Sequence, residues 1–141
     1  MVTTRIASEL SGLSYGQIKY WTREGVLSRP VTVDRRNSYA WSLYDLTLLR
    51  LAGMLKSDGY SLKAIKQAVS LVEDNWKEID NPDQAGVLMV TPDGRFGWLL
   101  ETDLNLTAGD VSQSISGFTH LPNFFYNTRL IAYDIFSKVE T

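Results

Sequence analysis

A short stretch near the N-terminus sets cationic, amide and aromatic side chains close together. Residues 14–27 read SYGQIKYWTREGVL and include Gln17, Lys19, Tyr20 and Arg23. Lysine, arginine and tyrosine donate to phosphate oxygens, and a glutamine amide bonds either adenine or a phosphate. If this stretch is a helix that enters a major groove, these side chains can contact DNA. The alternative interpretation is a solvated helix face on which Tyr20 is half-buried.

The first element that must position these side chains is a helix over about Thr4 to Ser11. Thr3 or Thr4 has the side-chain oxygen that a helix N-cap needs. Gly12 ends the helix because glycine adopts positive φ without strain.

A second helix is expected from about Tyr15 to Glu24, with Ser14 as its N-cap. Ile18 and Trp21 lie three positions apart, so we expect both to face the core. Gly25 is suited to the left-handed position that follows a helix. Two helices with so short a connection, which includes a glycine, predict a helix-turn-helix.

A charged hairpin is predicted next, over residues 28–41 (SRPVTVDRRNSYAW). Apolar and polar residues alternate on both sides of a turn-prone DRRN sequence. Two adjacent arginines at a tip cannot both pack inward, so they are available to phosphate or to a minor groove. The tip candidates are Arg35, Arg36 and Asn37, and a merely solubilising turn is the alternative.

A pair of longer helices should follow the hairpin. Ser42 with Asp45 resembles a capping box, and this third helix is expected to end near Gly59. Ser61 caps a fourth helix that fades near residues 76–79. Residues 80–84 have turn composition, so we place a domain boundary there, between residues 1–79 and 80–141.

The second half reads as a small α+β domain. Two apolar runs flank Pro92-Asp93-Gly94 and predict a hairpin, and Asp110 caps a short helix over residues 111–116. Residues 127–140 (NTRLIAYDIFSKVE) fit two patterns. Successive side chains alternate as they would in a strand, and the same residues also form the apolar stripe of a helix. We favour a strand to about Tyr133 and then a short helix capped by Asp134.

The aromatic residues of this half have three interpretations: they are core, a dimerisation surface, or a pocket for an apolar or cationic ligand. His120 has no ligand partner at metal spacing, so we interpret it as structural. The acids Glu101, Asp103 and Asp110 are interpreted as solvated rather than cation-binding.

Composition excludes several classes of site. The chain has no cysteine and one histidine, which excludes thiolate metal sites, a cysteine nucleophile and a histidine-rich metal site. No Ser-His-Asp set is plausible, so we expect neither an enzyme nor a cofactor. No apolar run approaches the roughly 20 residues of a membrane span, and no secretory signal precedes the first helix.

Charge is divided unevenly along the chain. The net charge of -2 combines a balance of +3 in residues 1–75 with -5 in residues 76–141. A basic half suits a polyanion, and an acidic half suits a ligand, a protein partner or a second copy.

The order helix-turn-helix, charged hairpin and helix pair resembles the MerR family of bacterial transcription regulators. The resemblance covers residues 3–72, about half of the chain. It is carried by Gly12-Leu13-Ser14, Gln17-Ile18-Lys19-Tyr20-Trp21, Gly25-Val26-Leu27, Arg36-Asn37, Trp41-Ser42, Asp45-Leu46 and Gly59-Tyr60-Ser61-Leu62-Lys63-Ala64-Ile65.

The resemblance implies a fold that is mainly α with small β: a winged helix-turn-helix followed by a small α+β domain. It implies a cytoplasmic, nucleoid-associated regulator that binds double-stranded operator or promoter DNA as a homodimer. The resemblance also makes RNA polymerase and a small-molecule effector candidate partners. It does not imply a membrane as a partner. The DNA-binding candidates are Ser14, Tyr15, Gln17, Lys19, Tyr20, Arg23, Arg35, Arg36 and Asn37.

Three departures from the family pattern change these expectations. Lys19 stands where the family has an arginine, which keeps a cation but loses the planar fork that reads guanine. Tyr39 stands at the position after the wing's Gly-Tyr where the family usually has an arginine. Asn81-Pro82 stops the fourth helix early, which predicts a dimer without the usual coiled coil, or a monomer that assembles on DNA.

A protein-interaction adaptor, or an excisionase-like architectural DNA-binding protein, is the alternative function. In the adaptor, the acidic half would bind a protein and DNA contact would be secondary.

Overall fold

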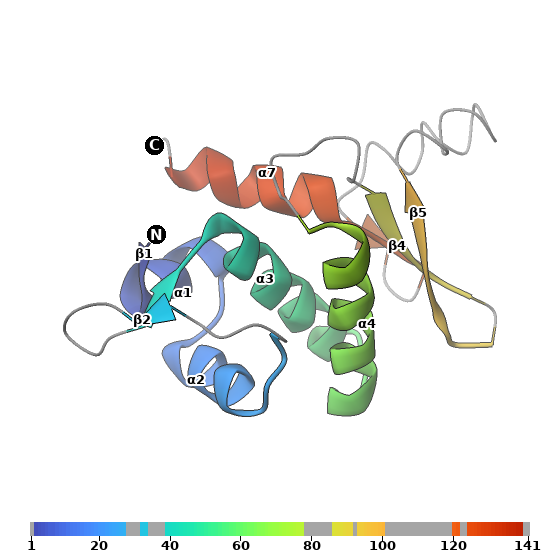
Figure 1. The fold of residues 1–141 in the computed structure, drawn as a ribbon, viewed down its shortest axis with the longest axis horizontal. Coiled ribbons are helices and arrows are strands. Elements are labelled where there is room, and N and C mark those ends of the chain that lie inside the picture. The colour runs from blue at the N-terminus through green and yellow to red at the C-terminus, as the bar shows by residue number, and fades with distance from the viewer. Residues whose placement is uncertain are drawn as a thin grey trace.

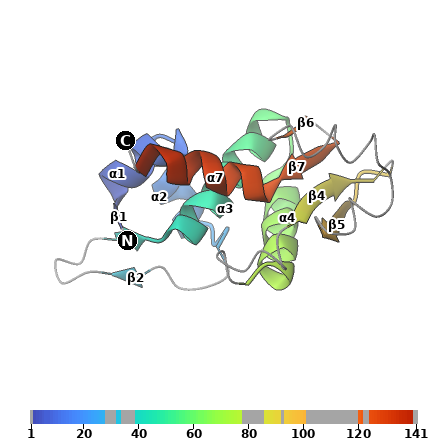
Figure 2. The same ribbon diagram turned by 90° about the horizontal axis from the view of Figure 1, so that it is seen from above.

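The computed structural model of the 141-residue chain describes residues 2–27, 32–33, 39–77, 86–91, 93–100, 120–121 and 124–139. Its helices are α1 (Thr4–Ser11), α2 (Tyr15–Arg23), α3 (Leu43–Ser57), α4 (Leu62–Asn75) and α7 (Thr128–Val139). Its strands are β1 (Val2–Thr3), β2 (Thr32–Val33), β3 (Tyr39–Trp41), β4 (Gly86–Val90), β5 (Phe96–Leu100), β6 (His120–Leu121) and β7 (Phe125–Asn127). Figures 1 and 2 show α3 in the middle, with α7 running along it.

Local capping chemistry explains where α1 and α2 begin. The Thr3 hydroxyl accepts from the Ile6 N–H at 3.4 Å, and Gly12 follows α1 at a φ of 74°. Ser14 and Gln17 form a reciprocal capping box at the start of α2. The two helices and their connection were predicted from the sequence, and both are confirmed.

Helices α3 and α4 also begin where their caps predict. Ser42 and Asp45 form a capping box at α3, and the Ser61 side chain accepts from the Ala64 N–H at α4. Gly59, at a φ of 97°, makes the connection between them in a conformation that other residues rarely adopt.

The first sheet is small and has the strand order β1-β3-β2. The predicted pairing of the strands on either side of residues 34–38 is confirmed, because Val33 pairs with Tyr39 and Thr32 with Ala40. Strand β1 was not predicted; Val2 pairs with Trp41 on the other edge of β3. The DRRN tip lies outside the described residues.

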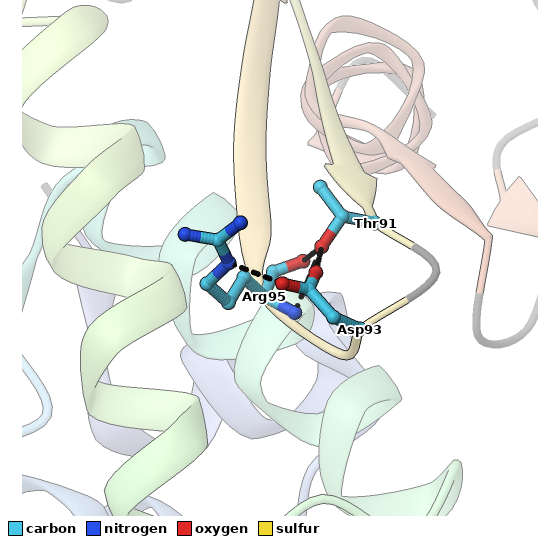
Figure 3. Close-up of polar contacts among 3 residues, drawn as sticks. All are labelled: Thr91, Asp93 and Arg95. Atoms are coloured by element: carbon cyan, nitrogen blue, oxygen red, sulfur yellow. Dashed lines mark hydrogen bonds and ion pairs between the residues drawn. The ribbon is translucent and has the colours of Figure 1, made fainter.

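The second sheet has the order β5-β4-β7-β6, and all its pairings are antiparallel. The predicted hairpin over β4 and β5 is confirmed. Its turn is held by polar contacts that Figure 3 shows among Thr91, Asp93 and Arg95. The Thr91 hydroxyl bonds the Asp93 carboxylate, and Arg95 Nε lies 2.7 Å from the same carboxylate. Both contacts lower the pKa of Asp93, led by the Thr91 hydrogen bond.

The C-terminal segment corrects one prediction. Instead of a strand to Tyr133, residues Thr128–Val139 form one continuous helix, α7, and the strand β7 ends at Asn127. The Asn127 side chain accepts from the Leu130 N–H at 3.2 Å, which caps α7 at its first turn. Period-two alternation and a helical stripe coexist in this segment, and packing against α3 selects the helix.

One hydrophobic core extends through both halves of the chain. Helix α3 is buried on nearly all sides, and α7 contributes Ile131, Ala132 and Ile135 to the same cluster. Val87 and Phe125 form a smaller cluster on the second sheet. The predicted boundary at residues 79–80 and the predicted helix over residues 111–116 lie outside the described residues, so both stay predictions.

Candidate DNA-binding face

The outward face of α2 carries six of the side chains predicted to contact DNA. All six are exposed, whereas Ile18 and Trp21 are only 1% and 3% exposed on the inner face. Trp41, at the end of β3, is also buried. The six exposed residues are Ser14, Tyr15, Gln17, Lys19, Tyr20 and Arg23.

Two cations on this face lie over tyrosine rings of the same helix. The Lys19 ammonium is 4.7 Å from the centre of the Tyr15 ring, and the Arg23 guanidinium carbon is 5.7 Å from that of Tyr20. A cation over an aromatic face is attracted by about 0.5–1 kcal/mol at an exposed site. The stacking therefore biases both charges to the outer surface of α2.

Gln17 takes part in the capping box of α2, which limits the contacts that it could make with DNA. Its side-chain carbonyl accepts from the Ser14 N–H at 2.9 Å in the capping box. A bidentate contact with adenine needs both the carbonyl and the amide N–H₂ group. While the cap holds, the N–H₂ group is the part of Gln17 that can reach out, as a donor to a phosphate or to a base acceptor. The S-x-x-Q spacing in the sequence already signalled this cap.

A groove of about 390 Å³ runs beside α2, between it and the start of α4. Lys56, at the end of α3, brings a cation to this groove and was not among the predicted residues. No local motif marks Lys56, because only the tertiary fold brings the end of α3 to this groove. The groove is lined by Ser14, Gly16, Gln17, Tyr20, Trp21, Lys56, Leu62 and Ile65.

The predicted residues of the hairpin tip, and two further arginines, are placed differently. Arg35, Arg36 and Asn37 lie outside the described residues, so their role stays a prediction. Arg5 is exposed on α1. Arg50 on α3 faces α7, where its guanidinium is 3.7 Å from the Asp134 carboxylate.

The aromatic residues of the second half divide between core and surface. Tyr126 and Phe125 are buried, whereas Phe124, Tyr133 and Phe136 are 62%, 66% and 44% exposed. Phe96 and Trp98 are partly buried against the main core. Phe118 lies outside the described residues, as do Glu101, Asp103 and Asp110.

Other kinds of site were also sought in the described part of the chain. These residues hold no group of three or more His, Asp or Glu side chains placed to bind a metal ion. None of the helices within the same ranges is both long enough and apolar enough to cross a membrane.

Comparison with known families matches residues 2–71 to the MerR helix-turn-helix family of regulatory proteins. The chain belongs to the MerR family. The match spans α1, α2, the first sheet, α3 and most of α4, which includes the whole exposed face of α2. Members of this family are DNA-binding transcription regulators rather than enzymes. A comparison with curated proteins gave no match.

Proposed function

We propose that this MerR-family protein is a sequence-specific regulator that places α2 in the major groove of operator or promoter DNA. The observation that carries the proposal is the division of α2 into a buried face and an exposed face with Lys19 and Arg23. A helix with this division enters the major groove while its inner face stays on the core.

The side chains of α2 then have separable tasks. Lys19 and Arg23 contact phosphates, with Tyr15 and Tyr20 supporting them through the ring contacts. The Gln17 amide is the donor on this face with access to a base edge. The hairpin of β2 and β3 carries Arg35, Arg36 and Asn37 to the neighbouring backbone or minor groove.

The test is selection of bound sequences from a random duplex pool, at two salt concentrations. We expect an enriched motif and steep salt dependence. Lys19→Ala should weaken binding to all sequences alike and lower the salt slope by about 1, as expected for one lost phosphate contact.

Arg95→Ala is the matched control, because Arg95 is an exposed cation on the β4–β5 turn, away from α2. It should leave both affinity and slope unchanged. Weak binding with no enriched motif would overturn sequence-specific regulation in favour of an architectural role. If Lys19→Ala and Arg95→Ala had equal effects, α2 would not be part of the DNA interface.

We further propose that the regulator is a homodimer formed through α7. Helix α4 ends at Asn75, so within the described residues it does not extend into a long pairing helix. Tyr133 and Phe136 are exposed one turn apart on α7. In an antiparallel two-fold pairing, each Tyr133 meets the partner's Phe136, and the exposed Arg129 approaches the negative end of the partner's helix dipole.

Sedimentation equilibrium tests this dimer. The wild-type chain should sediment as a dimer, and Tyr133→Ser with Phe136→Ser should sediment as a monomer that keeps the helical circular dichroism of the wild type. A wild-type monomer without DNA, or a dimer that survives both substitutions, would rule out this interface.

A further inference from the structure

A pocket of about 460 Å³ lies where three parts of the fold meet. The α1–α2 turn forms one wall with Leu13, α3 forms the floor with Arg50 and Met54, and Lys138 comes from the last turn of α7. Figures 1 and 2 show the C-terminal end of α7 lying near α1 and along α3. The pocket is distinct from the groove between α2 and α4.

The pocket combines two cations with an apolar wall. Arg50 and Lys138 both line it, on different helices, so their charges are held at one place only by the tertiary fold. Leu13 and Met54 supply apolar surface beside them. Pockets of about 300–1,000 Å³ with an apolar lining and a few placed polar groups are typical of small-molecule sites.

Arg50 keeps most of its hydrogen-bonding capacity. Its ion pair with Asp134 has an N–O distance of 3.7 Å, longer than a hydrogen bond. The Arg50 side chain is 20% exposed and that of Asp134 is 50% exposed. A guanidinium has five N–H donors in a fork that matches two phosphate oxygens. A single long contact therefore leaves Arg50 able to bind an anion bidentately.

Two neutral donors complete the lining. Gln17 borders the pocket, and its amide N–H₂ group is not used by the capping box, which takes the carbonyl. Ser57, the last residue of α3, also lines the pocket and has a hydroxyl donor. A ligand held by Arg50 would thus be within the same pocket as a side chain of α2.

We propose that this pocket binds a phosphate group. Arg50 is the forked donor, Lys138 is the second cation, and Gln17 and Ser57 supply neutral hydrogen bonds. The apolar wall has room for the organic part of a small phosphorylated molecule. Because α7 and the α1–α2 turn both border the site, such a ligand would connect the C-terminal helix to the end of α2 that carries its cap.

The experiment is a titration of the full chain with inorganic phosphate, followed by amide shifts in ¹H–¹⁵N correlation spectra, with chloride at matched ionic strength as the reference. We expect saturable shifts at the Gly12 and Gly53 amides, which border the pocket. No saturable shift at these amides would overturn the proposal.

Two substitutions at the same ion pair give opposite predictions. Arg50→Gln should weaken phosphate binding at least tenfold, whereas Asp134→Asn should tighten it because the competing carboxylate charge is removed. If the pair is only structural, the two variants should behave alike and neither should change the titration. Arg95→Gln, an exposed cation elsewhere, is the control and should change nothing.

A second arm identifies the source of the phosphate group. The salt dependence of binding to duplex DNA is compared for wild type and Arg50→Gln. An unchanged slope assigns the site to a free molecule, and a slope lower by about 1 assigns it to the DNA backbone. Lys138→Gln serves as the second variant if Arg50→Gln fails to fold, with the same expected loss of phosphate binding.

Discussion

Helix α2 turns Ile18 and Trp21 into the core, and helix α7 turns Ile131 and Ile135 into the same core. The outer faces of the two helices differ. On α2 the exposed aromatic rings lie beside Lys19 and Arg23, whereas on α7 Tyr133 and Phe136 are exposed one turn apart.

This difference indicates the partners of the two surfaces. Cations stacked on aromatic rings suit phosphate and bases, and clustered aromatic side chains suit a protein surface. The inner faces of the helices are alike because both must be apolar to join the same core. In the proposed assignment, the outer faces distinguish a helix that binds DNA from a helix that binds a second copy. Four tests address the packing that both helices depend on, beginning with the largest expected effect.

The packing of α7 is tested by Ile135→Ala. Ile135 is fully buried, so its truncation should lower the free energy of unfolding by about 2–5 kcal/mol in urea denaturation. The neighbouring Phe136→Ala removes a larger side chain that is 44% exposed and should change the stability of the monomer by about 0.5 kcal/mol or less. Equal losses would mean that α7 does not pack as described.

The link between the second sheet and the helix pair is tested by Tyr126→Phe. Tyr126 is fully buried on β7, and its hydroxyl donates to the carboxylate of Asp58, the C-cap residue of α3. Loss of a hydrogen bond to a charged group should lower the free energy of unfolding by about 1.5–3 kcal/mol. Tyr133→Phe, at an exposed position of α7, is the control and should have no measurable effect.

The caps of the two helices are compared by Asn127→Ala and Ser14→Ala. Each removes a side-chain oxygen that accepts a backbone N–H in the first turn, and each should cost about 1 kcal/mol. The loss should be larger for Asn127, which is 5% exposed, than for the exposed Ser14. Urea denaturation of the two variants measures this, and the reverse order would contradict the burial of the α7 cap.

The smallest effect concerns alkaline pH. Burial, and then the nearby Asp58 carboxylate, raise the pKa of Tyr60, because both disfavour the ionised phenol in the folded state. Its contribution to stability is therefore fully present below the unfolded pKa of about 10 and is lost as pH rises above it. The urea midpoint should fall between about pH 9 and about pH 11, and it should fall less in Tyr60→Phe. Equal falls would mean that Tyr60 is not the group responsible.

Helices α1 to α4 were predictable because their signals are local. A serine or threonine at each N-cap and a glycine after α1, α2 and α3 lie within a few residues of the helix ends that they define. The spacing of Ile18 and Trp21 predicted which face of α2 is buried. The other side chains of the helix were then expected to be exposed.

Only the C-terminal part of helix α7, after Asp134, was predicted, although one local signal for its true start was present. Asn127 followed by Thr128 is a helix start, but alternation over residues 129–135 favoured a strand equally well. The choice depends on α3, which offers a surface that Ile131 and Ile135 cover together only in a helix. Strand β1 was missed for a similar reason, since two residues carry no periodicity and pair only because β3 lies beside them.

The sequence by itself determined the family, the order of the first four helices and the residues on the exposed face of α2, because caps and periodicity act over one or two turns of chain. The tertiary structure alone decided that Lys56 joins this face, that Arg50 and Lys138 share a pocket, and that α7 completes the core of the first half. These placements join residues far apart in the chain, and only burial of apolar surface against α3 brings them together.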